Sequence, residues 1–134
     1  MTTPPSEEHP MELPPGLDRT MGLEILEMTA DRVVGRMPVA GNTQPFGLWH
    51  GGASCVMAET LGSMGSSLHA GKGRRAVGID INATHHKGAT EGWIRGVATA
   101  AHRGRSLATY DVVLTHEETG RRICTARLTC MLLD

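Results

Sequence analysis

Six stretches of the chain have the pattern of β-strands, and one longer stretch has that of a helix. In residues 122–132 the apolar positions recur at every second residue, at Cys124, Ala126, Leu128, Cys130 and Leu132. This period of two is typical of a strand with one apolar face. β-type residues between turn signals predict further strands at 22–28, 32–39, 76–82, 93–101 and 107–116, although the first could instead form a helical turn. Short turns between consecutive strands favour antiparallel pairing.

Residues 51–69 follow the helical period of three to four residues. The apolar positions on this period are Val56, Met57, Leu61, Met64 and Leu68, and small residues lie between them at Ala53, Ala58, Gly62 and Gly65. A helix rich in small residues can pack closely against a flat surface such as a sheet. Gly71 is expected to end it. The element order β-β-α-β-β-β-β predicts an α+β fold in which one helix covers one face of a six-stranded sheet.

Composition adds limits on function and location. The 134 residues suit one domain, and we expect a flexible N-terminal tail at 1–18 followed by a domain at 19–134. A net charge of -1 gives no sign of a nucleic-acid partner, and the tail has no apolar run for a signal peptide or membrane anchor. Three cysteines at irregular spacing predict reduced thiols and a cytoplasmic protein rather than a disulfide framework or a zinc site.

Glu59 is the first candidate for chemistry. It is the only charged residue between Gly51 and Ala70, among apolar and small neighbours. A carboxylate in such surroundings is a candidate nucleophile or general base, although it could also simply point to solvent. Ser63 lies four residues further on the same helical face and could hydrogen-bond Glu59 or a water.

Gly51 and Gly52 at the predicted helix start leave backbone N–H groups unshielded. Such donors could stabilise an oxyanion, although the glycines could equally form a plain tight entry into the helix. Gly51 and Glu59 are eight residues apart, or roughly 12 Å along a helix. One helix therefore does not easily supply both groups to one carbonyl, whereas two antiparallel copies side by side would. The spacing predicts a dimer with sites at its interface.

His85 and His86 are neighbours in or just after a strand, so their side chains are expected on opposite sides. This arrangement argues against a metal site, and both could be ordinary surface or interface residues. Lys87 and Arg105 lie in predicted turns, where they could meet phosphates or could simply be solvated.

At these positions the chain resembles a known family. The segment 44–54 with Ala58 and Glu59, together with residues 80–87 and 103–106, resembles the hotdog-fold thioesterases of the PaaI-like group. The resemblance is strongest to 1,4-dihydroxy-2-naphthoyl-CoA and enterobactin-pathway proofreading thioesterases, and more distant to the Arthrobacter-type 4-hydroxybenzoyl-CoA thioesterase. It spans residues 22–133 and implies a six-stranded antiparallel sheet wrapped around the central helix, in dimers that usually form tetramers.

The resemblance also implies roles for individual residues. Glu59 would be the nucleophile or general base, and Gly51 the oxyanion donor. Gln44, His50 and Ser63 match polar residues around the thioester. His85 or His86, with Lys87, would lie at the substrate, and Gly104–Arg105 would meet the CoA phosphates. The implied substrate is an aromatic or medium-size acyl thioester of CoA or a carrier protein, with no metal or other cofactor.

Two alternatives stay open at this point. A hotdog hydratase or dehydratase would be expected to pair a histidine with the acid, but His50 is nine residues from Glu59. A non-catalytic acyl-CoA-binding protein would bind the same ligand without turnover. Trp49 occupies a position where a smaller aliphatic residue is common in the family, so we expect it to alter the pocket.

Overall fold

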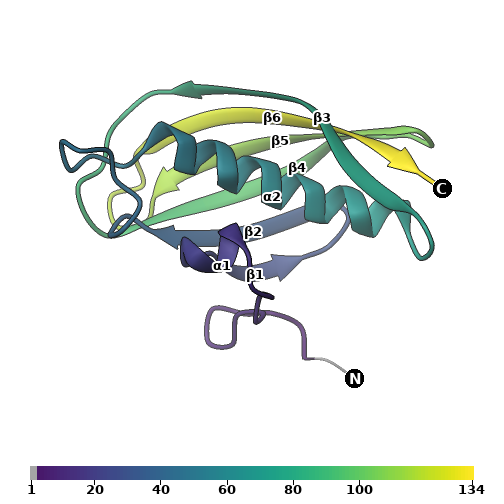
Figure 1. Cartoon of the computed structure of the whole chain (residues 1–134), viewed down its shortest axis with the longest axis horizontal. Coiled ribbons are helices and arrows are strands. Elements are labelled where there is room, and N and C mark those ends of the chain that lie inside the picture. The colour runs from purple at the N-terminus through teal and green to yellow at the C-terminus, as the bar shows by residue number, and fades with distance from the viewer. Residues whose placement is uncertain (1–2) are drawn as a thin grey trace.

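The computed structural model describes residues 3–134 as one curved sheet around a long helix (Figure 1). In chain order the elements are α1 (Leu17–Thr20), β1 (Glu24–Met28), β2 (Arg32–Pro38), α2 (Gly51–Ala70), β3 (Arg75–His85), β4 (Trp93–Arg103), β5 (Leu107–His116) and β6 (Arg122–Leu133). This is the predicted α+β arrangement. The short helix α1 is an addition that the sequence pattern did not predict.

The six strands form one antiparallel sheet in the order β1-β2-β4-β5-β6-β3. Strands β4, β5 and β6 pair with their chain neighbours, as expected from short turns, and β1 and β2 form the expected hairpin. The alternation in β6 is confirmed, because its predicted apolar positions are buried at every second residue. One face of the sheet therefore supplies the core on which α2 lies.

Small residues let α2 lie close to the sheet. A Cβ atom added at Gly62 would come within 2.6 Å of the Leu128 side chain on β6. One added at Gly65 would come within 2.6 Å of the Tyr110 ring on β5. The neighbouring Leu61 is fully buried, and its side chain packs over β2 and β4. The expectation that small residues allow close packing on a sheet is confirmed.

Strand β3 differs from its prediction in length and pairing. It extends to His85 rather than ending near residue 82, and it pairs with β6 rather than with β4. The connection of residues 86–92 crosses from one edge of the sheet to its interior, because the sheet curves around α2 and brings the last strand beside the third (Figure 1). Local patterns carry no information on this long-range pairing.

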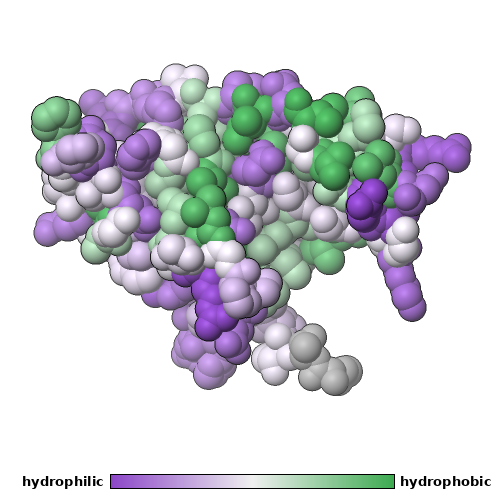
Figure 2. Space-filling view, in the orientation of Figure 1, coloured by the Kyte–Doolittle hydropathy of each residue, from purple (hydrophilic) through white to green (hydrophobic). Residues whose placement is uncertain are grey.

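Strand β3 exposes several apolar side chains. Val77, Ile79 and Ile81 are 39%, 52% and 38% exposed, on a strand that forms one edge of the sheet. Figure 2 shows apolar residues on the same side of the molecule as α2 and β3. An apolar edge strand of this kind is a surface on which another chain can add.

The N-terminal segment contacts the domain at several points. Leu13 is buried, the Met11 N–H donates to the Ile25 carbonyl at 3.2 Å, and the Thr60 hydroxyl donates to Asp18 at 2.6 Å. The Glu7 carboxylate pairs with Arg95 at 2.7 Å. Within the segment predicted as a flexible tail, residues 11–18 thus pack beside β1 and α2.

Candidate functional site

The start of α2 borders a hollow of about 300 Å³, called here the helix-start hollow. It is lined by Gln44, Leu48, Trp49, Gly51, His85, His86, Lys87, Gly88 and Ile123. Five of the predicted site residues therefore meet there: Gln44, Gly51, His85, His86 and Lys87. The two histidines reach it because β3 continues to His85, next to the helix start.

His50 caps the helix. Its backbone is extended (φ -74°, ψ 128°), and its Nδ1 accepts a hydrogen bond from the Gly52 N–H at 2.8 Å. An Nδ1 that accepts leaves the proton of a neutral imidazole on Nε2, which is free to donate. The His50 ring lies on the other flank of the helix start, where it borders a hollow with Leu17 and Val56 rather than the helix-start hollow.

The Gly51 N–H has no acceptor among residues 3–134, because the capping bonds involve the N–H groups of Gly52, Ala53 and Ser54. A Cβ atom at Gly51 would lie 2.9 Å from the His85 ring nitrogen Nε2. Glycine therefore keeps this donor open on the side where the histidine lies. A free N–H at a helix start is the arrangement that stabilises a developing oxyanion.

Gln44 is held by the loop that precedes the helix. The Gln44 N–H donates to the Leu48 carbonyl at 2.8 Å, and the Phe46 N–H donates to the Gln44 side-chain oxygen at 3.0 Å. With its oxygen engaged, the side-chain amide offers its NH2 group to the hollow. Trp49 is buried beneath, and its indole N–H donates to the Ser54 hydroxyl at 2.7 Å.

Glu59 borders a second hollow of about 430 Å³, called here the Glu59 hollow. It is lined by Met11, Asp18, Met28, Glu59, Thr60, Ser63, Met64, Ser67 and Leu68. Three methionines and a leucine make most of its wall apolar, and adaptable methionine side chains suit a pocket that takes an apolar group. Ser63 lines it as predicted, but its hydroxyl lies 3.9 Å from the Cys130 sulfur, and the structure shows no hydrogen bond from it to Glu59.

The two hollows share no lining residue. One chain therefore does not bring Gly51 and Glu59 together, which agrees with the separation expected from their spacing along the helix. The face of α2 that carries Glu59 lies beside the exposed strand β3.

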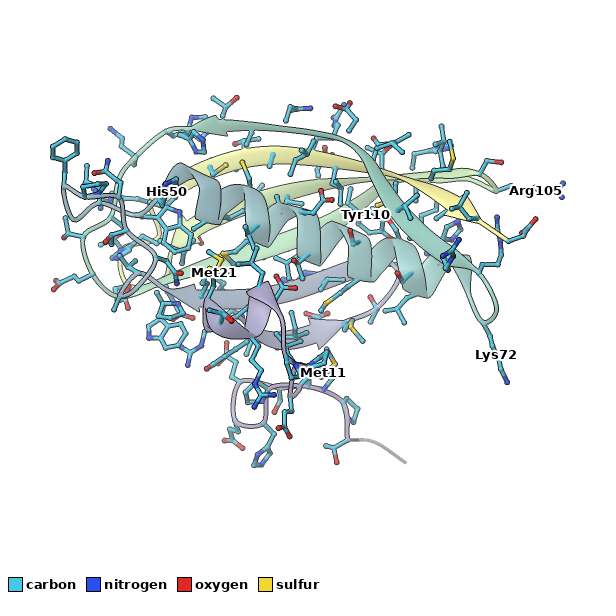
Figure 3. All side chains as sticks on the ribbon, viewed as in Figure 1. Met11, Met21, His50, Lys72, Arg105 and Tyr110 are labelled. Atoms are coloured by element: carbon cyan, nitrogen blue, oxygen red, sulfur yellow. The ribbon has the colours of Figure 1, made fainter. Side chains whose placement is uncertain are left out.

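The residues predicted to meet CoA phosphates divide between the two ends of the molecule. Lys87 lines the helix-start hollow, whereas Arg105 lies at the opposite end of the long axis from His50 (Figure 3). The turn at Gly104 is tied to the end of α2, because its carbonyl lies 2.7 Å from His69 Nε2. Within one chain Arg105 and Lys87 do not share a site.

Two residues at the Glu59 hollow were not predicted from the sequence. Asp18 reaches it from α1, and no local pattern marked that residue. Gly78 on β3 lies directly against the Glu59 carboxylate. An isolated glycine inside a strand pattern often marks a bulge or a close approach, so the Gly78 position carried a usable signal.

Within residues 3–134, no three side chains of the metal-ligating types come together as a metal site. No helix there has both the length and the apolar character needed to span a membrane. The described cysteines are free thiols, and burial raises the pKa of Cys124.

Comparisons with known proteins agree with this architecture. A family model described as the thioesterase superfamily matches residues 46–123. The proofreading thioesterase EntH of Cronobacter turicensis is 42% identical over 114 residues, which are 84% of this chain and 82% of that protein. A thioesterase from Haemophilus influenzae has a TM-score of 0.83 at 35% identity, covering 87% of this chain and 82% of its own. One from Staphylococcus aureus has a TM-score of 0.83 at 31% identity, covering 87% and 98%.

Proposed function

The chain belongs to the thioesterase superfamily and is a thioester hydrolase, and we propose that its substrate is an aromatic or medium-size acyl thioester of CoA, cleaved with Glu59 as the catalytic carboxylate. The observation that carries this proposal is the position of Glu59. It is the one charged residue of α2 and borders an apolar hollow large enough for such an acyl group. The hydratase and the non-catalytic alternatives are less consistent with relatives that are thioesterases.

The positions that were mutated in one structural relative support the assignment of both Glu59 and Gln44 to the site. The Staphylococcus aureus protein was solved once with a glutamate and once with a glutamine replaced by alanine. These two positions are separated by the same number of residues as Gln44 and Glu59. We take them as the counterparts of Gln44 and Glu59.

In the proposed reaction the thioester carbonyl accepts a hydrogen bond from the Gly51 N–H, with the Gln44 amide as a further donor, while His50 caps the helix start that carries the Gly51 N–H. Glu59 either attacks the carbonyl carbon or removes a proton from an attacking water. If Glu59 attacks, the C–S bond breaks to leave an anhydride between the acyl group and Glu59, and a water then hydrolyses this anhydride. If Glu59 is a general base, the water oxygen adds to the carbonyl carbon and the C–S bond breaks as the tetrahedral intermediate collapses. In both routes the water supplies the oxygen of the free acid and the proton that the departing thiolate takes up. The products are the free acid and the thiol of CoA.

We also propose that the working unit is a homodimer, further paired as a tetramer. The support is the separation of the Gly51 and Glu59 hollows and the exposed apolar residues of the edge strand β3. Each site would then combine Glu59 and Ser63 of one chain with Gln44, Gly51 and His85 of the other. Free cysteines support a place in the reducing cytoplasm.

The test is release of free thiol from a panel of acyl-CoAs: benzoyl, hydroxybenzoyl, dihydroxynaphthoyl, phenylacetyl and straight-chain. Glu59→Gln is expected to lower kcat by about a hundredfold or more, because it removes the carboxylate at nearly constant volume. Glu8→Gln, an exposed glutamate away from both hollows, is the matched control and should keep full activity. If Glu59→Gln keeps wild-type turnover, Glu59 is not the catalytic group.

A further inference from the structure

The Glu59 carboxylate lies against the backbone of β3 at Gly78. A Cβ atom built at Gly78 would lie 3.2 Å from the Glu59 carboxyl carbon and 3.3 Å from Oε2, with Oε1 closer still. The first carbon of any side chain at this position would therefore overlap the carboxylate. The absence of a side chain at Gly78 leaves the space that the carboxylate fills.

The strand is irregular at this point. Gly78 pairs with Cys130 of β6 and Asp80 pairs with Thr129, so Ile79 is an extra residue with no partner of its own. Such bulges redirect the backbone locally and are frequent beside active sites. Ser63, one turn after Glu59, contacts the same Cys130. The bulge and the helix thus meet at the carboxylate and its neighbouring hydroxyl.

Backbone conformation alone does not require glycine here. Gly78 is absent from the glycines with positive φ, so an L-residue can adopt its conformation. It is also exposed in the single chain, and an added methyl group would meet the Glu59 side chain rather than the core. The three heavy atoms nearest to a Cβ atom at this position all belong to the Glu59 carboxyl group.

From these contacts we propose that Gly78 is a positioning residue, whose missing side chain sets the orientation of the Glu59 carboxylate for attack. The inference rests on the proposed role of Glu59. The β3 bulge then serves to orient the Glu59 carboxylate, in addition to pairing with β6 in the sheet.

The experiment is Gly78→Ala in the full-length protein, assayed on the best acyl-CoA of the panel. A carboxylate displaced by a methyl group should lower kcat by about tenfold to a hundredfold. KM should stay within about twofold, because the acyl and CoA contacts are retained. The melting temperature should not fall, since alanine fits the backbone and its nearest neighbours are the atoms of the movable Glu59 carboxyl group.

Gly96→Ala is the matched control. Its added methyl group would lie 2.8 Å from Leu61 and 3.0 Å from Met57, inside the core and away from the carboxylate. We expect this variant to lose stability and to keep kcat. If both alanine variants lose activity in proportion to their loss of stability, Gly78 has only a structural role.

A double-mutant cycle with Glu59→Asp gives the sharper test. The shorter aspartate withdraws its carboxylate from β3, so Gly78→Ala should change the single-turnover rate of this variant by less than about twofold. An equal loss from Gly78→Ala in the wild-type and Glu59→Asp backgrounds would overturn the proposal. Loss of activity in Glu59→Gln with none in Gly78→Ala would overturn it while leaving the proposed function intact.

Discussion

Replacing His50 by alanine removes the side-chain cap of α2. The Gly52 N–H, bonded to His50 Nδ1 at 2.8 Å, would lose its protein acceptor. Loss of an N-terminal cap typically costs about 1 kcal/mol of stability. For a chain of this length that corresponds to a fall of about 4 °C in melting temperature. Thermal and urea unfolding followed by circular dichroism would measure it.

His50→Asn separates capping from catalysis. Asparagine is a good capping residue, so this variant should recover the stability that alanine loses. The His50 ring borders a different hollow from Gln44 and Gly51, so we expect this variant to keep kcat within about twofold of wild type. Unchanged stability of His50→Ala would refute the capping argument. A kcat of His50→Asn about tenfold or more below wild type would show that the imidazole also acts at the carbonyl.

Packing and exposure give three more predictions. Leu61→Ala removes a fully buried side chain from the helix–sheet contact and should lower the free energy of unfolding by about 3 kcal/mol, measured in urea. Because Cys124 and Cys130 are fully buried and burial raises the pKa of Cys124, iodoacetamide at pH 8 should modify both only after unfolding, as read by mass spectrometry. Ile79→Asp places a charge at an exposed position of β3 and should dissociate the proposed oligomer, so that sedimentation velocity shows a smaller species and activity is lost in parallel. An unchanged sedimentation coefficient would contradict the proposed interface.

The elements of the fold could be predicted where the pattern is local. The alternation in β6 and the helical period in α2 are each set by which neighbours face the core, so they are visible in a few residues. Strand β3 shows the limit. Its apolar residues Val77, Ile79 and Ile81 predict a strand, but they are partly exposed rather than part of the core, and its partner β6 lies at the far end of the chain. Pairing over that distance depends on how the sheet curves around the helix.

For the candidate site, too, the sequence predicts individual residues but not how they meet in space. Glu59 is conspicuous because it is a lone charge in an apolar helix, and Gly51 because glycine leaves a helix start open. The contact between Glu59 and Gly78 could not be predicted, because it joins two elements whose packing no local pattern specifies. The place of His50 also required the three-dimensional structure, since only this shows that its ring caps the helix and borders a different hollow from Gln44.

Two carboxylates border the Glu59 hollow, and their hydrogen bonds distinguish them. Asp18 accepts the Thr60 hydroxyl at 2.6 Å, which engages one of its oxygens in holding α1 against α2. The Glu59 carboxylate accepts no hydrogen bond and makes no ion pair within residues 3–134, and it lies against the backbone at Gly78. A carboxylate without such partners keeps its lone pairs for an acyl carbon or a water. This difference, rather than charge alone, favours Glu59 over Asp18 as the proposed reactive group.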